Sequence, residues 1–311
     1  MAVKKKINIF LILRLLGVGL FIFILTRVDL SDTAQALKNV DPALFGLGIV
    51  FQILLLLIKA IRWHIMNNGA GIGSSWVSSF GRFFESYAIG VITPGRVGEL
   101  IKVGHEKNKN DKINTLIRII SERGFDVGFF VLIASLALMT GDFIQMSTEL
   151  IWLIFIGGIV IVTVAFLLLS SKYLLKLLQN ILSIFPGRMF EVELQSKQYM
   201  MTQTIFIFVL SFFSNMSHFV SCYYLSQSVS MDSGFLMISG GVAISGLLNM
   251  LPITVLGLGT RELTFLTVFK TYTQSTIIAF SATMLIVAQI GGGIIALILG
   301  QIFLFIEKKR N

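Results

Sequence analysis

The sequence predicts an all-α, polytopic membrane protein with about six transmembrane helices and two re-entrant helical hairpins arranged as an inverted repeat. Of its 311 residues, 55% are hydrophobic and 13% are charged, and the mean hydropathy is +0.85. Apolar stretches follow one another with short connections, which indicates a single integral membrane domain over residues 1–311. Two further apolar stretches are each interrupted by a proline- and glycine-rich break, which predicts the hairpins.

A helix that crosses the hydrocarbon core needs about 20 mostly apolar residues. Stretches of that kind predict spans at about 8–26, 42–62, 114–139, 150–170, 201–226 and 276–306. The first stretch follows three lysines and resembles a signal peptide, but its length and its lack of a small-residue cleavage site predict an uncleaved span.

The two interrupted segments, about 72–101 and 234–270, have halves that are too short to cross a bilayer. We therefore predict that each dips into the membrane and returns on the same side. The residues that break the helices are Pro94, Gly95 and Gly98 in the first segment and Pro252, Gly257 and Gly259 in the second.

Loop charges predict the topology, because cytoplasmic loops carry an excess of Lys and Arg. Basic residues precede the first span, lie between the first hairpin and the third span (Lys102 to Arg118), follow the fourth span and end the chain. Both termini are then cytoplasmic, and the hairpins enter from opposite faces. Residues 42–139 and 201–306 form inverted halves, as in transporters, and residues 171–199 form an interfacial connector.

Ionisable side chains inside the apolar stretches are the candidate site. A charged residue at the centre of a span costs about 2.5–3.5 kcal/mol, so these side chains must face one another or a hydrated cavity. In one reading they are structural ion pairs; in the other, arginines bind an anionic headgroup and carboxylates support them. The motif as a whole favours the second reading, since a structural clamp needs neither hairpin to be broken. The arginines are Arg82, Arg96, Arg123 and Arg261, and the carboxylates are Glu85, Glu99, Glu122, Asp126 and Glu262.

Other chemistries find no support in the sequence. The single cysteine, Cys222, lies in a hydrophobic segment, and His and Cys show no metal-binding spacing, so neither a metal nor a cofactor is expected. Neither a Gly-x-Ser-x-Gly element nor an ATPase phosphate loop is present. The net charge of +9 comes from residues that flank apolar runs, which indicates anionic lipid and not nucleic acid as the partner.

Three elements resemble the lysylphosphatidylglycerol synthase transmembrane-domain family. They are Pro94-Gly95-Arg96-Val97-Gly98-Glu99, Ser121-Glu122-Arg123-Gly124-Phe125-Asp126 and Gly257-Leu258-Gly259-Thr260-Arg261-Glu262. The resemblance implies a membrane domain that moves lipids between leaflets. In bifunctional members this domain flips aminoacylated phosphatidylglycerol made by an attached aminoacyltransferase domain, and no such domain follows here, so a stand-alone form is expected.

These observations lead to three hypotheses. The first is a flippase-like transporter of the cytoplasmic membrane that moves an anionic or aminoacylated phospholipid, or a polyprenyl-linked lipid. The second is a membrane protein that does not transport but partners a lipid-modifying or glycan-assembly enzyme. The third, a lipid-acting enzyme such as a lysyltransferase, lacks a catalytic domain in this sequence.

Overall fold

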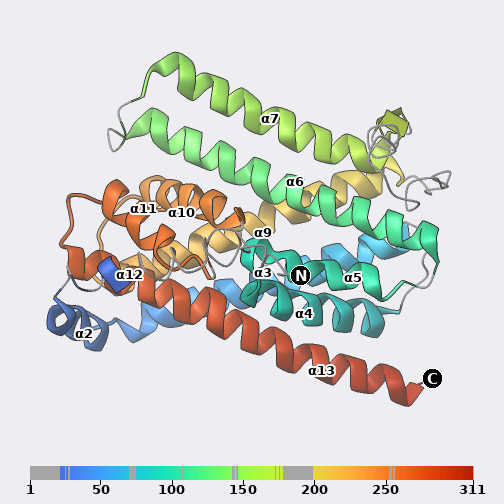
Figure 1. The fold of residues 1–311 in the computed structure, drawn as a ribbon, viewed down its shortest axis with the longest axis horizontal. Coiled ribbons are helices and arrows are strands. Elements are labelled where there is room, and N and C mark those ends of the chain that lie inside the picture. Colours follow the sequence, from blue (N-terminus) through green and yellow to red (C-terminus); the bar gives the residue numbers. More distant parts are fainter. Residues whose placement is uncertain are drawn as a thin grey trace, which may run out of the picture.

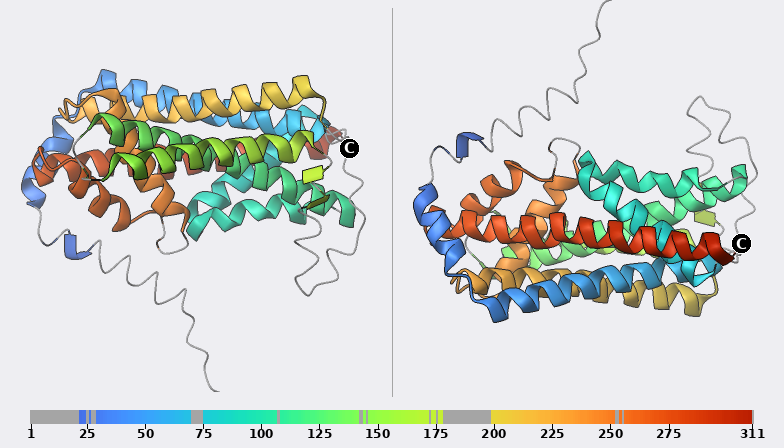
Figure 2. Two further views of the ribbon diagram at one scale, coloured as in Figure 1. Left: turned by 90° about the horizontal axis from the view of Figure 1, so that it is seen from above. Right: turned by 90° about the horizontal axis from the view of Figure 1, so that it is seen from below.

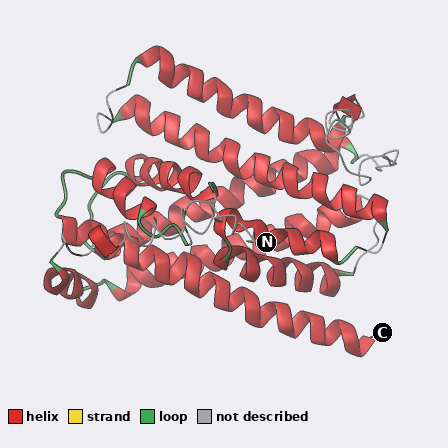
Figure 3. Ribbon diagram, in the orientation of Figure 1, coloured by secondary structure: helices red, strands yellow, loops and turns green. Residues whose placement is uncertain are grey.

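The computed structural model describes residues 22–24, 26, 29–69, 75–106, 108–141, 144, 146–171, 173–174, 176–177, 199–251, 254 and 256–310. Every regular element in these ranges is helical (Figure 3), which confirms the all-α prediction. Most of the expected first span 8–26, most of the connector 171–199 and the break residue Pro252 lie outside the described residues.

The described chain forms eleven α-helices, one 3₁₀ segment (η1) and one π-helical segment (η2). In order they are α2 (Leu30–Lys38), α3 (Pro42–Gly69), α4 (Trp76–Ile92), η1 (Pro94–Leu100), α5 (Ile101–Gly104), α6 (Lys109–Thr140), α7 (Thr148–Ser170), α9 (Met201–Ser228), α10 (Phe235–Met250), α11 (Thr260–Val268), α12 (Gln274–Met284), η2 (Leu285–Gly291) and α13 (Gly292–Arg310).

Within the described residues, five helices are long and apolar enough to cross a membrane. Four are α3, α6, α7 and α9, and the fifth is the continuous stretch Gln274–Lys309, which joins α12, η2 and α13. They match five of the six predicted spans, so the protein is a multi-pass membrane protein. The third span begins earlier than predicted, at Lys109 instead of about 114.

Long helices pack side by side in pairs: α3 with α9, α6 with α7, and α4 with α13 (Figures 1 and 2). Small residues permit the close approach, as is usual between membrane helices. A Cβ on Gly300 of α13 would lie 2.9 Å from the backbone nitrogen of Glu85 on α4. Between α9 and α3, Ser217 and Ser221 donate hydrogen bonds to backbone carbonyls of Phe51 and Gly48, at 2.6 and 2.7 Å.

The outward faces of the long helices carry large apolar side chains. Helix α7 lies at one edge of the bundle (Figure 1) and exposes Leu153 and Val160, at 65% and 52%. Exposed apolar surface of this extent suits a hydrocarbon environment. Several charged side chains of the long helices, among them Arg62, Glu122 and Asp126, are nonetheless buried inside the bundle.

The first broken segment folds back on itself after Ile92. Arg82 of α4 pairs with Glu106 (3.7 Å), and Glu85 pairs with His105 (3.0 Å), so the segment after the break returns along α4. Close to the turn, a Cβ on Gly98 would lie 2.7 Å from the carbonyl oxygen of Ile89. The two arms thus form a tight helical hairpin.

The second broken segment folds back in the same manner. Near the break, Thr260 of α11 donates a hydrogen bond to the Asn249 side chain of α10 (2.9 Å). Further away, a Cβ on Gly241 would lie 2.5 Å from the Phe269 ring. Both predicted breaks are therefore real interruptions between antiparallel helical arms. The re-entry of these two segments into the membrane, their entry from opposite faces, and the inverted repeat stay predictions.

Candidate functional site

Both helix breaks open onto one cavity of about 130 Å³. The first break contributes Thr93, Gly95 and Arg96 to its wall, and the second contributes Leu256 and Gly257. Since one water molecule needs only roughly 10–15 Å³ of such volume, the cavity has room for a small polar group together with water. Helices α3, α6, α9, α10, α11 and η2 complete the wall with Gln52, Lys59, Arg123, Asp126, Asn215, Asn249, Arg261 and Gln289, among others.

Backbone conformation at the two breaks is unusual in the same way. Gly95 and Arg96 have φ of 59° and 55°, and Leu256 and Gly257 have φ of 56° and 70°. This left-handed region is disfavoured for residues with a side chain, and such residues concentrate at functional sites. At Arg96 the conformation carries the guanidinium into the cavity wall, where it lies 5.3 Å from the centre of the Tyr87 ring and is 36% exposed.

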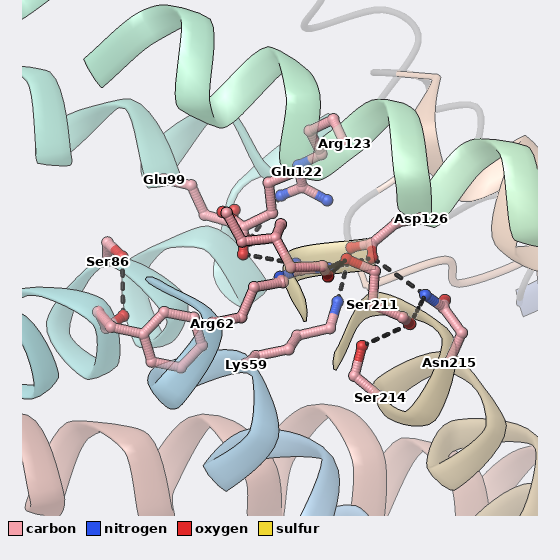
Figure 4. A network of polar contacts seen from close by, with 12 residues as sticks. Lys59, Arg62, Ser86, Glu99, Glu122, Arg123, Asp126, Ser211, Ser214 and Asn215 are labelled. Atoms are coloured by element: carbon pink, nitrogen blue, oxygen red, sulfur yellow. Dashed lines mark hydrogen bonds and ion pairs between the residues drawn. The ribbon is translucent and has the colours of Figure 1, made fainter. Parts of the chain in front are cut away.

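A first buried ion cluster joins α3 to α6 (Figure 4). Glu122 of α6 accepts from Arg62 of α3 (2.6 Å). It also accepts from Lys102 of α5, on the return arm of the first hairpin (3.2 Å). Asp126, one turn further along α6, accepts from Lys59 (2.6 Å) and Arg62 (3.4 Å). These five side chains are all nearly buried, so their charges interact with little solvent screening.

Helix α9 supplies the neutral donors and acceptors around this first cluster. Asn215 donates to Asp126 (3.2 Å), and Arg62 donates to the hydroxyl of Ser211 (2.8 Å). Charged groups inside a membrane protein need such additional hydrogen bonds for their remaining polar atoms. Figure 4 shows both side chains turned toward the cluster from one helix.

A second ion cluster lies beside the first, at the break of the first hairpin. Glu99 forms an ion pair with Arg123 of α6, at 2.6 Å, and lies 3.8 Å from Arg96. Glu99 packs against α4, where a Cβ on Gly90 would lie 2.6 Å from the Glu99 side chain. The carboxylate therefore holds two arginines that line the cavity, one on the hairpin and one on α6.

Charges in the two clusters do not balance. The first cluster contains three cations and two carboxylates, and the second contains two cations and one carboxylate. Among the described ion pairs, each cluster therefore retains one positive charge without a carboxylate. Uncompensated charge inside a membrane costs several kcal/mol, so an anion in the cavity would stabilise this arrangement.

Arg261 and Glu262 form a third pair at the start of α11. Glu262 accepts from the Arg261 guanidinium at 2.7 Å, and its other oxygen accepts from the backbone N–H of Gly259 at 2.6 Å. Ser281 of α12 accepts from Nε of Arg261 at 2.7 Å. Nη1 of Arg261 has no hydrogen-bond partner among the described residues, although Arg261 lines the cavity. This guanidinium therefore has one free donor group for an anion.

Not every predicted headgroup-binding arginine reaches this cavity. Arg96, Arg123 and Arg261 line its wall, whereas Arg82 lies beside Glu106 at the far end of the first hairpin. Glu85 likewise pairs with His105 and lies outside the clusters.

The remaining predicted carboxylates form ion pairs with buried or partly buried cations: Glu99, Glu122, Asp126 and Glu262. Of the predicted break residues, Pro94, Gly95 and Gly98 lie within η1, and Gly257 and Gly259 both have a positive φ.

Several residues of the site were missed from the sequence. Lys59 and Arg62 belong to the first cluster, and they could have been recognised as two cations three residues apart near the end of an apolar span. The prediction that Lys102 and Arg118 are loop charges was wrong, because they are 2% and 1% exposed. Both are hidden by the helices that pack around them, and Lys102 is drawn inward by its pairing with Glu122.

The three motif elements of the sequence thus meet in space: the two hairpin breaks and the Glu122–Asp126 stretch of α6 all contribute to one cavity. A family model described as the lysylphosphatidylglycerol synthase transmembrane region matches residues 9–299. The chain belongs to this family. The match covers nearly the whole chain, in agreement with the resemblance carried by the three elements. A comparison with curated proteins finds no match.

Proposed function

We propose that this member of the lysylphosphatidylglycerol synthase transmembrane family moves a lipid between the leaflets of the cytoplasmic membrane, with the anionic headgroup in the cavity between the hairpins. The observation that carries the proposal is the meeting of both helix breaks, and three arginines, at one cavity. Broken helices that meet within the membrane are a recurrent feature of transporter sites. Both termini lie in the cytoplasm in this proposal.

Phosphate is the anion that fits this wall best. Guanidinium groups present a planar set of donors that matches phosphate oxygens. Arg96 is the most accessible of the three arginines, and the free donor of Arg261 comes from the opposite hairpin. A phosphate between the two hairpins would contact both breaks at once and would offset part of the surplus positive charge.

In this proposal the carboxylates of the clusters orient the arginines that bind the phosphate. Glu99 orients Arg96 and Arg123, and Glu262 orients Arg261. A site made of arginines alone would hold the phosphate too firmly to release it, since a transported group must leave as well as bind. The acyl or prenyl tails stay in the surrounding lipid, next to the apolar outer faces of the helices.

The test is a leaflet-resolved headgroup assay in liposomes that contain the purified protein. Arg96→Ala and Arg261→Ala should each lower the transport rate by at least tenfold, because each removes a charge-assisted contact to phosphate worth about 1.5–3 kcal/mol. Arg82→Ala is the matched control, since Arg82 lies in the same hairpin but does not line the cavity. Wild-type rates for both Arg96→Ala and Arg261→Ala would refute the proposed role.

A further inference from the structure

Two carboxamides lie together at the cavity and take no part in the ion clusters. Gln52 of α3 donates through Nε2 to the carbonyl of Ala288 (3.4 Å), which places it beside Gln289 of η2. Gln52 is 3% exposed, and both side chains line the cavity. The Oε1 atoms of Gln52 and Gln289 have no hydrogen-bond partner among the described residues. Buried acceptors without partners are costly and indicate a missing donor.

A π-helical segment positions these amides. η2 interrupts the last span at Leu285–Gly291, and π-turns of this kind are rare and frequently mark functional sites. Its widened turn presents the carbonyl of Ala288 to Gln52 and places Gln289 on the cavity wall. The segment therefore contributes Gln289 to the cavity wall and the carbonyl that accepts from Gln52.

The amides adjoin the arginine side of the cavity through Tyr87. A Cβ on Gly292 would lie 3.3 Å from Nε2 of Gln52 and 3.7 Å from the hydroxyl of Tyr87. The ring of Tyr87 is in turn 5.3 Å from the guanidinium of Arg96. A ligand bound at Arg96 therefore lies in the same cavity as the two amides.

An ammonium group is a poor candidate for the missing donor. Asp126, the carboxylate that lines the cavity, already accepts from Lys59, Arg62 and Asn215. The surrounding clusters carry surplus positive charge, so a further cation would be repelled. A hydroxyl group donates a hydrogen bond without adding charge.

We infer that the cavity selects a polyol phosphate headgroup, in which arginines bind the phosphate and the amides of Gln52 and Gln289 accept hydrogen bonds from hydroxyl groups. This inference rests on the proposed function and narrows its substrate class. A glycerol-bearing phospholipid and a polyprenyl phosphosugar both present this chemistry. Zwitterionic and aminoacylated headgroups are disfavoured.

The test compares the binding of three diester phospholipids to the full-length protein in lipid nanodiscs. Phosphatidylglycerol carries hydroxyls, phosphatidylethanol carries no donor, and phosphatidylethanolamine carries an ammonium group. Wild type should bind phosphatidylglycerol about five- to tenfold more tightly than phosphatidylethanol, as expected for the added hydrogen bonds to the two amides. Phosphatidylethanolamine should bind most weakly. A polyprenyl phosphohexose, measured in the same way, distinguishes the two sources of the headgroup by its affinity relative to phosphatidylglycerol.

Variants then assign the preference to the amides. Gln52→Met and Gln289→Met should each weaken the preference for phosphatidylglycerol while leaving phosphatidylethanol affinity within about twofold, because each deletes only one acceptor. Retained phosphatidylethanol binding shows that a variant is folded. If Gln52→Met does not fold, Gln289→Met alone tests whether an amide produces the preference for phosphatidylglycerol. Gln301→Met, at an exposed position of α13, is the matched control and should keep the preference.

Two outcomes would overturn the inference. One is equal wild-type affinity for phosphatidylglycerol and phosphatidylethanol; the other is binding of phosphatidylethanolamine as tight as that of phosphatidylglycerol. If wild type binds both anionic lipids equally and transports them, only the hydroxyl selection fails. If it binds none of the anionic lipids, the proposed function fails as well.

Discussion

Replacing Asp126 by asparagine should destabilise the protein strongly, because this carboxylate neutralises buried cations. Asp126 accepts from Lys59 at 2.6 Å, from Arg62 at 3.4 Å and from Asn215 at 3.2 Å. Asparagine keeps the size of the side chain but removes the charge, so the first cluster then holds three cations and one carboxylate. Removing one partner of a buried ion pair costs about 3–5 kcal/mol, and we expect a loss of that size in the free energy of unfolding.

Lys59→Met should compensate for much of this loss. The double variant, Lys59→Met with Asp126→Asn, returns the cluster to one surplus positive charge and replaces the ammonium by an apolar side chain of similar length. We expect a coupling energy of about 1–3 kcal/mol between the two sites, as found for residues in direct contact. The double variant therefore distinguishes a loss of charge balance from the simple loss of a hydrogen bond.

Reversible unfolding in mixed detergent micelles, followed by circular dichroism, measures these free energies. Asp32→Asn, at an exposed site in the first turn of α2, is the control and should cost less than about 1 kcal/mol. Two results would refute the charge-balance reasoning. One is a free energy of unfolding for Asp126→Asn within 1 kcal/mol of wild type. The other is a loss of stability in the double variant that equals the sum of the losses in the two single variants.

Three further predictions test the hairpin and its break. Gly98→Ala should cost about 1–3 kcal/mol of stability, since its Cβ would lie 2.7 Å from the backbone oxygen of Ile89, whereas Gly104→Ala, with open space around it, should be tolerated in the same unfolding assay. Arg96→Gly should stay within about 1 kcal/mol of wild type, because relief of the left-handed backbone offsets the added freedom of the unfolded chain, yet it should abolish transport in liposomes; normal transport would contradict the headgroup role. Glu99→Gln should tighten phosphatidylglycerol binding by about 1 kcal/mol in a nanodisc binding assay, since it frees two arginines to donate to phosphate; weaker binding would show that Glu99 chiefly builds the site.

Much of the fold was predictable because a long uninterrupted apolar stretch is a strong signal of a membrane-spanning helix. Five of the predicted spans match helices α3, α6, α7, α9 and the Gln274–Lys309 stretch. The two broken segments were predictable as well, since Pro and Gly within an apolar run interrupt a helix for a definite steric reason.

Partners inside the site were less predictable, because pairing depends on how helices pack. Spacing along one helix allowed Arg123 to pair with Asp126, but Arg123 contacts Glu99 of the hairpin instead. Lys102 lies in a stretch of basic residues that has the composition of a loop, yet the return arm of the hairpin brings it to Glu122. No rule of local sequence could reveal these contacts between distant segments.

Photochemical labelling tests the central claim, that a lipid headgroup occupies the cavity between the two breaks. Phosphatidylglycerol with a diazirine on its headgroup would be cross-linked to the protein in nanodiscs, and the labelled peptides mapped by mass spectrometry. The account predicts labels at both breaks, around Thr93–Arg96 and Leu256–Gly257, and their loss in Arg96→Ala but not in Arg82→Ala. Labels confined to the lipid-facing surface of α7, unchanged by Arg96→Ala, would contradict it.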